Sequence, residues 1–110
     1  MTLGKLIAAL KAVPNQDGVV PWGFGEPDSY RGYYEDVAFE PASNVTIAGM
    51  LRHAESALGA TFEGYKGGDF LMDENTRCWV SEHGRASGEL IGKTLVKYMI
   101  LSVTRGDGAL

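Results

Sequence analysis

Tyrosine, arginine, lysine and glycine gather in three segments of this sequence, and together they can recognise a small anionic ligand. Tyrosine rings stack on aromatic ligands, a guanidinium group pairs with phosphate or carboxylate, and glycine exposes backbone N–H groups to anions. This mixture suits a nucleotide-like molecule. The predicted ligand-binding residues are Tyr30, Arg31, Tyr33, Tyr34, Tyr65, Lys66 and Arg85.

The same side chains suit two other roles. Tyrosine and arginine supply much of the binding energy of protein–protein interfaces, so these residues fit a protein-binding surface equally well. The tyrosines can also pack against the ends of a sheet and have no binding role. All three interpretations remain open at the level of sequence.

A double substitution, Arg31→Ala with Lys66→Ala, distinguishes a binding role from a structural one. If both cations bind a ligand from exposed loops, the variant loses ligand binding while its melting temperature stays nearly unchanged. Thermal denaturation with and without nucleotides measures both quantities. An unfolded double variant would assign these residues to structure instead.

Catalysis has one candidate in the sequence, a cysteine–histidine pair. Cys78 needs His53 or His83 within hydrogen-bond distance to act as a thiolate nucleophile. Cys78 lies beside Trp79 in a predicted strand, where a buried and unreactive thiol is expected. We therefore predict no catalytic residue.

The metal and phosphate motifs are incomplete. The segment 92–94 (GKT) resembles the end of a P-loop, but Ser87 stands where that motif needs its first glycine. Asp69, Asp73 and Glu74 lack the alternating oxygen ligands of a calcium loop. We predict neither a metal site nor a cofactor, and interpret residues 92–94 as an ordinary helix surface.

Length and charge restrict the class of protein. The chain has 110 residues, one cysteine and a formal net charge of −4 at pH 7. This length suits one domain, and a lone cysteine fits a reducing cytosol. The acidic balance disfavours long nucleic acids, and no apolar run reaches the roughly 20 residues that cross a bilayer. We expect a cytoplasmic protein with no membrane or long nucleic-acid partner.

Hydrophobic periodicity and turn residues predict three helices and four strands. Thr2, Thr46 and Ser87 are the expected helix caps. The last two strands flank a turn and are expected to form a hairpin. The helices are expected over 3–13, 45–58 and 89–102, and the strands over 19–24, 37–40, 69–72 and 77–81.

These elements predict an α+β fold in the order α-β-β-α-β-β-α. A small antiparallel sheet of about four strands is expected, with the helices on one face. Residues 1–103 form the predicted single domain, and residues 104–110 form a flexible C-terminal tail. Exposed sheet edges favour a homo-oligomer.

Three segments of the sequence resemble small proteins encoded by bacteriophages and prophages, especially those of actinobacteria. These are residues 1–4, 29–34 and 57–68, and the likeness covers most of the chain. It implies a phage accessory protein that acts in the cytosol of a bacterial host, where such proteins often block defence. No settled activity of that group assigns roles to residues of this chain.

Two routes to blocking a defence are open. The protein can sequester a nucleotide signal without turnover, which its glycine, arginine, lysine and tyrosine residues favour slightly. It can instead attach directly to a host defence protein. A small enzyme that cleaves the signal is a third alternative.

Overall fold

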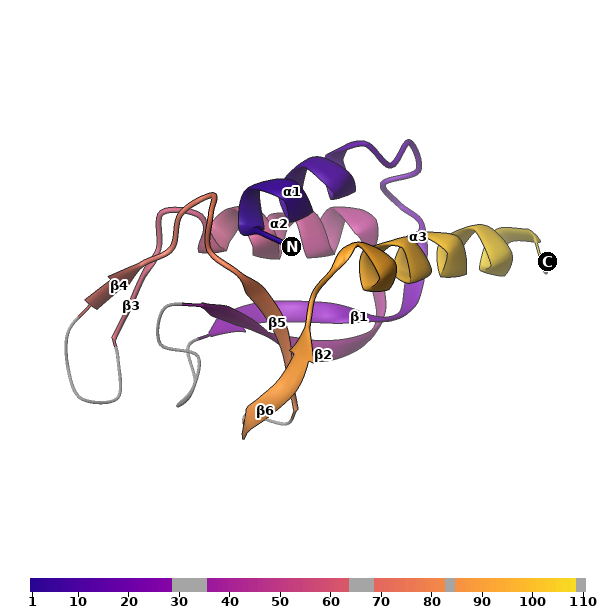
Figure 1. Cartoon of the computed structure of the whole chain (residues 1–110). Coiled ribbons are helices and arrows are strands. Elements are labelled where there is room, and N and C mark those ends of the chain that lie inside the picture. The colour runs from indigo at the N-terminus through magenta and orange to yellow at the C-terminus, as the bar shows by residue number, and fades with distance from the viewer. Residues whose placement is uncertain (29–35, 64–68, 83–84, 109–110) are drawn as a thin grey trace.

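The computed structural model describes residues 1–28, 36–63, 69–82 and 85–108 of the chain (Figure 1). In chain order the elements are α1 (Leu3–Lys11), β1 (Val19–Asp28), β2 (Val37–Thr46), α2 (Ile47–Ala57), β3 (Thr61–Glu63), β4 (Asp69–Leu71), β5 (Cys78–Glu82), β6 (Arg85–Leu90) and α3 (Lys93–Gly108). Four strands form one sheet in the order β1-β2-β5-β6, and β3 and β4 form a separate two-stranded ribbon. The predicted α+β class is confirmed.

The first two helices begin at the caps that the sequence predicts. The Thr2 hydroxyl accepts a hydrogen bond from the Lys5 N–H at 3.4 Å, and the Thr46 hydroxyl accepts one from the Gly49 N–H at 2.9 Å. These hydroxyls satisfy N–H groups that have no partner inside the helix. After α2, Gly59 has a φ of +82°, a backbone conformation that glycine adopts without steric cost.

The core lies between the helices and one face of the four-stranded sheet, and Figure 1 shows α1, α2 and α3 on that side. Phe24 of β1 and Phe39 of β2 are fully buried, and their ring centroids lie 4.5 Å apart. Burial of this apolar surface is the main force that fixes the helices to the sheet. The helices contribute Leu3, Leu6, Leu10, Ile47, Met50, Ala54, Val96 and Met99 to the core.

The hairpin of β1 and β2 is longer than predicted. β1 continues to Asp28, past its predicted end at residue 24, and β2 continues through Pro41 to Thr46, past its predicted end at residue 40. Pro41 has no backbone N–H, but β5 pairs only with residues 37–39 of β2. The missing N–H therefore removes no hydrogen bond between β2 and β5, and proline is tolerated there. Pro41 pairs with Phe24 across the hairpin, and a register shift between Phe24 and Pro27 marks a bulge in β1.

The predicted hairpin between residues 69–72 and 77–81 is wrong. β4 pairs with β3 instead, while β5 pairs with β2 in parallel and with β6 antiparallel. The turn between β4 and β5 is real: the Asp73 carboxylate accepts from the Asn75 N–H at 2.8 Å, and the Thr76 hydroxyl accepts from the Asp73 N–H at 2.8 Å. It leads the chain from the ribbon into the main sheet, which is therefore mixed rather than purely antiparallel.

The C-terminal part also differs from the prediction. The expected helix cap, Ser87, lies inside β6, and α3 begins at Lys93 rather than near residue 89. β6 pairs with β5 through Trp79 and Leu90. The alternation of RASGEL is too weak to indicate a strand, and its small residues resemble a loop. At its other end, α3 runs past residue 102 to Gly108.

Candidate anion-binding site

The predicted ligand-binding residues fall almost entirely outside the described part of the chain. Arg85 is the first residue of β6, and the structure describes its backbone alone. Their convergence into one site therefore stays a prediction. The residues that lie outside the described ranges are Tyr30, Arg31, Tyr33, Tyr34, Tyr65 and Lys66.

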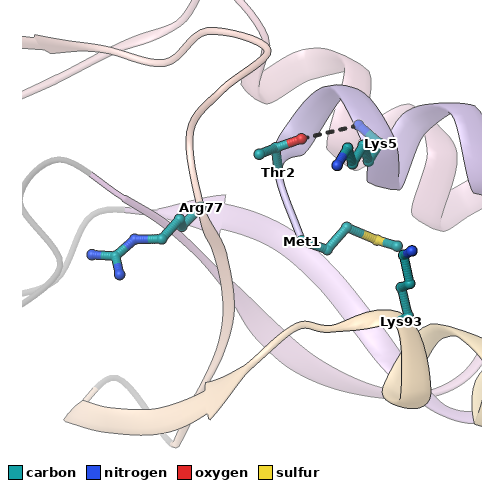
Figure 2. A pocket seen from close by; sticks show the side chains of 5 residues that line it. All are labelled: Met1, Thr2, Lys5, Arg77 and Lys93. Carbon is teal, nitrogen blue, oxygen red and sulfur yellow. Dashed lines mark hydrogen bonds between the residues drawn. The ribbon is translucent and has the colours of Figure 1, made fainter.

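A cationic pocket of about 390 Å³ lies among the described residues, at the start of α1 (Figure 2). Its lining comes from three segments that are distant in sequence: the first residues of the chain, the residue before β5 and the first residue of α3. Of the five described residues in its lining, three carry cationic side chains and none is acidic. The lining residues are Met1, Thr2, Lys5, Arg77 and Lys93.

Backbone hydrogen bonds hold the two lysine-bearing segments in place. The Met1 ammonium donates to the Ile91 carbonyl at 2.7 Å, which ties the start of the chain to the segment that precedes Lys93. In Figure 2 the Met1 side chain extends toward Lys93. The positions of Lys5 and Lys93 are thus coupled through main-chain contacts rather than through flexible side chains.

The other wall of the pocket is fixed by the segment before β5. Thr2 forms an isolated antiparallel bridge with Arg77, and the Gly4 N–H donates to the Glu74 carbonyl at 2.9 Å. A Cβ at Gly4 would come within 3.1 Å of that carbonyl oxygen, so this close approach favours glycine. The start of α1 is therefore anchored on both sides.

Arg77 differs from the two lysines because an acid partly neutralises it. Its guanidinium lies 3.1 Å from the Asp36 carboxylate, which also accepts a hydrogen bond from the Trp79 indole N–H at 2.9 Å. Figure 2 shows the guanidinium directed away from Met1 and Lys93. Within the described ranges, Lys5 and Lys93 form no ion pair, so they are the principal charges available to an anion.

Substitution of Asp36 should increase the anion affinity of the pocket. Asp36→Asn keeps an oxygen for Trp79 but removes the charge that holds Arg77, so we expect inorganic triphosphate to bind about threefold more tightly by calorimetry. The free energy of unfolding should fall by about 1 kcal/mol or less, because the Arg77 side chain is 64% exposed and screened by solvent. Glu55→Gln, which breaks the Lys11 ion pair outside the pocket, is the control and should leave triphosphate affinity unchanged. An unchanged affinity in Asp36→Asn would show that Arg77 cannot reach the anion.

The lysines of the pocket lie where helix electrostatics disfavours them. Lys5 is in the first turn of α1 and Lys93 begins α3, and neither helix has an acid in its first turn. A cation at a helix N-terminus costs roughly 0.3–1 kcal/mol, whereas an anion is stabilised there. A bound anion would offset this cost for both helices. The sequence showed Lys5 in the first turn of a predicted helix, but the predicted start of the last helix near residue 89 hid the matching position of Lys93.

A neighbouring pocket shares Arg77 but has the opposite character. It measures about 490 Å³, and Asp36, Asp69 and Asp73 are in its lining. These carboxylates repel an anion, so the two sides of Arg77 are electrostatically distinct. Among the residues that the structure describes, no three His, Cys, Asp or Glu side chains are grouped to hold a metal ion.

Cys78 is buried and unreactive as the structure places it. Its side chain has no exposed area, and its thiol donates to the Thr76 carbonyl at 3.7 Å. Burial raises the pKa of the Cys78 thiol from its ordinary value of 9.0 to about 12, against a smaller opposite effect of the Met1 ammonium. The thiol therefore stays protonated at neutral pH and cannot serve as a thiolate nucleophile.

Alkylation tests this assignment directly. At pH 8, iodoacetamide should leave Cys78 unmodified in the folded protein and modify it fully in concentrated guanidinium chloride, as measured by mass spectrometry. The Cys78 thiol loses its proton near pH 9 in the unfolded chain and near pH 12 in the folded chain. Between these two pH values the folded state binds the proton more tightly than the unfolded state. The contribution of Cys78 to stability is therefore complete below pH 9 and declines as the pH rises toward 12. Rapid alkylation of the folded protein would contradict the burial.

The comparisons with known proteins assign no family. No protein-family model, curated protein or solved structure matches the chain. None of the helices in the described ranges combines the length and apolar character that a bilayer-crossing segment needs. The candidate site is therefore interpreted from its own residues.

Proposed function

We propose that this protein binds a small anionic ligand of the nucleotide type in the cationic pocket and holds it without turnover. The observation that carries this proposal is that Lys5 and Lys93, each at the start of a helix, line one pocket together with Arg77, and that the described lining contains no acid. Side-chain charge and helix dipoles act in the same direction there, and both favour an anion.

In this proposal the protein is a phage accessory protein that lowers the free concentration of a nucleotide signal in a bacterial host. The resemblance of residues 1–4, 29–34 and 57–68 to phage-encoded proteins supports that role. Sequestration requires tight binding and sufficient protein, and it requires no catalytic group. A defence that responds to the signal would then stay inactive.

The composition of the pocket supports binding over cleavage. Its described lining offers two lysine ammonium groups, the Asp36-paired guanidinium of Arg77, a thioether and the Thr2 hydroxyl, which already caps α1. None of these is a carboxylate or an imidazole that can act as a general base at neutral pH. Cys78, the one thiol of the chain, is buried.

A thermal-shift screen with linear and cyclic nucleotides, followed by mass spectrometry of each mixture, tests the proposal. A ligand at about 100 times its Kd stabilises the folded state by about 2.7 kcal/mol, so a true ligand produces a large shift. A shift with the nucleotide recovered intact is the expected result. A shift with the nucleotide consumed would make the protein an enzyme, and no shift with any nucleotide would overturn the proposal.

Attachment to a host protein is the second candidate, because the ribbon region exposes apolar side chains. Leu71 of β4 is 64% exposed, and Leu58, just before the ribbon, is also exposed. If the protein acts by this attachment, no nucleotide shifts its melting temperature. A specific host protein then co-purifies with the native protein and with the Lys5→Glu, Lys93→Glu variant, but not with Leu71→Ser.

A further inference from the structure

A second small pocket adjoins the cationic pocket, and Lys93 lines both. It measures about 380 Å³ and lies between the end of β6 and the first turns of α3. Its chemistry differs, because aromatic and aliphatic side chains replace the cations. Besides Lys93, the lining residues are Glu89, Leu90, Gly92, Thr94, Leu95 and Tyr98.

We infer that the ligand straddles Lys93, with its phosphates in the cationic pocket and its nucleobase against Tyr98 in the second pocket. This inference rests on the proposed function and names the ligand class more closely, as a nucleotide bound through both its phosphates and its base. Each pocket alone is near the lower size limit of small-molecule sites, which is about 300 Å³. Two adjoining pockets accommodate the two chemically distinct halves of one nucleotide.

Tyr98 supplies the surface on which a base stacks. Its side chain is 57% exposed, although it is a large aromatic residue in a helix whose inner face, with Val96 and Met99, is buried. Thr94 and Tyr98 are four residues apart, so they lie on the same side of α3. Leu90, also exposed, comes from the end of β6. A planar base covers this apolar surface and gains stacking energy with the ring.

Glu89 fixes the orientation of the ligand. Its carboxylate is exposed and lines the second pocket, where it repels phosphates. The phosphates therefore lie with Lys5 and Lys93, in the pocket whose described lining has no acid. The same carboxylate accepts hydrogen bonds from N–H groups on a base edge. Guanine offers two adjacent donors, the ring N1–H and the exocyclic amino group, whereas uracil offers one. Guanine nucleotides should therefore bind more tightly than uracil nucleotides.

Calorimetric titration with inorganic triphosphate, GTP and UTP tests this placement. The native protein should bind GTP about tenfold more tightly than inorganic triphosphate, which corresponds to one stacked base. Tyr98→Leu should bring the two affinities within about threefold of each other, because leucine keeps the apolar contact but offers no ring. Glu89→Gln should reduce the preference for GTP over UTP, because the neutral amide accepts the base N–H groups less strongly.

Leu101→Ala is the matched control, because Leu101 is an exposed residue of α3 that does not line either pocket. It should leave all three affinities unchanged, and melting temperatures should show that every variant is folded. Equal binding of GTP and inorganic triphosphate by the native protein would overturn the inference while the anion site stands. A failure of all three ligands to bind would overturn both the inference and the proposed function.

Discussion

Lys5→Glu with Lys93→Glu should abolish ligand binding while leaving the protein at least as stable as before. A hydrogen bond to a charged group contributes roughly 1.5–3 kcal/mol, so loss of two such bonds reduces affinity by about 100-fold or more. The new carboxylates also repel the phosphates. Calorimetric titration with GTP at low ionic strength measures this loss, and added salt should narrow the difference because exposed charges are screened.

The effect on stability makes this variant informative. Both lysines stand in the first turns of helices, where a carboxylate is favoured by roughly 0.3–1 kcal/mol. The melting temperature of the variant should therefore stay equal or rise, which separates lost binding from lost structure.

Lys11→Glu with Lys97→Glu carries the same change in net charge outside both pockets and should alter affinity by less than about threefold. If this control loses binding equally, the attraction is a general charge effect and the pocket is not the site.

Much of the helical structure could be predicted because its signals are local. Thr2 and Thr46 each lie directly before an amphipathic segment, and each hydroxyl caps the helix that follows. Gly59 ends the second helix with a positive φ. A capping residue, a helical period of apolar residues and a terminating glycine all act within a few residues of one another. These signals can therefore be recognised from the sequence alone.

Strand pairing could not be predicted in the same way, because a turn does not specify which strands pair. The segment 73–76 carries real turn chemistry, yet the strands on either side of it belong to different sheets. β3 has only three residues, too few to show an alternating pattern. The parallel pairing of Val37 with Cys78 joins segments that no local signal connects. Long-range packing decided these contacts.

The cationic pocket was missed for the same reason. Lys93 was interpreted as helix surface and Lys5 as part of a plain amphipathic helix, and each interpretation is locally adequate. Their association depends on the contact of Met1 with Ile91, which joins residues that are 90 positions apart in the sequence. Tyr98, the proposed stacking residue, lies within the predicted helix 89–102, but the helix prediction did not show that its side chain is largely in solvent.

Phe39→Ala should cause the largest loss of stability among the substitutions considered. Phe39 is fully buried in β2, where it pairs with Val80 of β5 and Pro27 of β1, and its ring packs on Phe24. Removal of a buried phenylalanine ring costs about 3–5 kcal/mol, since the transfer free energy of the ring is lost and a cavity remains. Domains of this size are stable by only about 5–15 kcal/mol, so much of the stability disappears.

Urea unfolding, with the midpoint and slope fitted together, measures this change. Phe39→Leu keeps most of the apolar volume and should cost less than about 1.5 kcal/mol, and Val19→Ala at an exposed position should cost less than about 0.5 kcal/mol. This order of effects distinguishes a loss of core packing from a general destabilisation by any substitution in the β1–β2 hairpin. A loss of stability below about 1 kcal/mol in Phe39→Ala would contradict this prediction. Removal of one ring of a buried aromatic pair has so small an effect only when the surrounding sheet collapses into the space. In that case the contact of β2 with β5, the one parallel pairing among the described strands, would not depend on the Phe39 ring at its last residue pair.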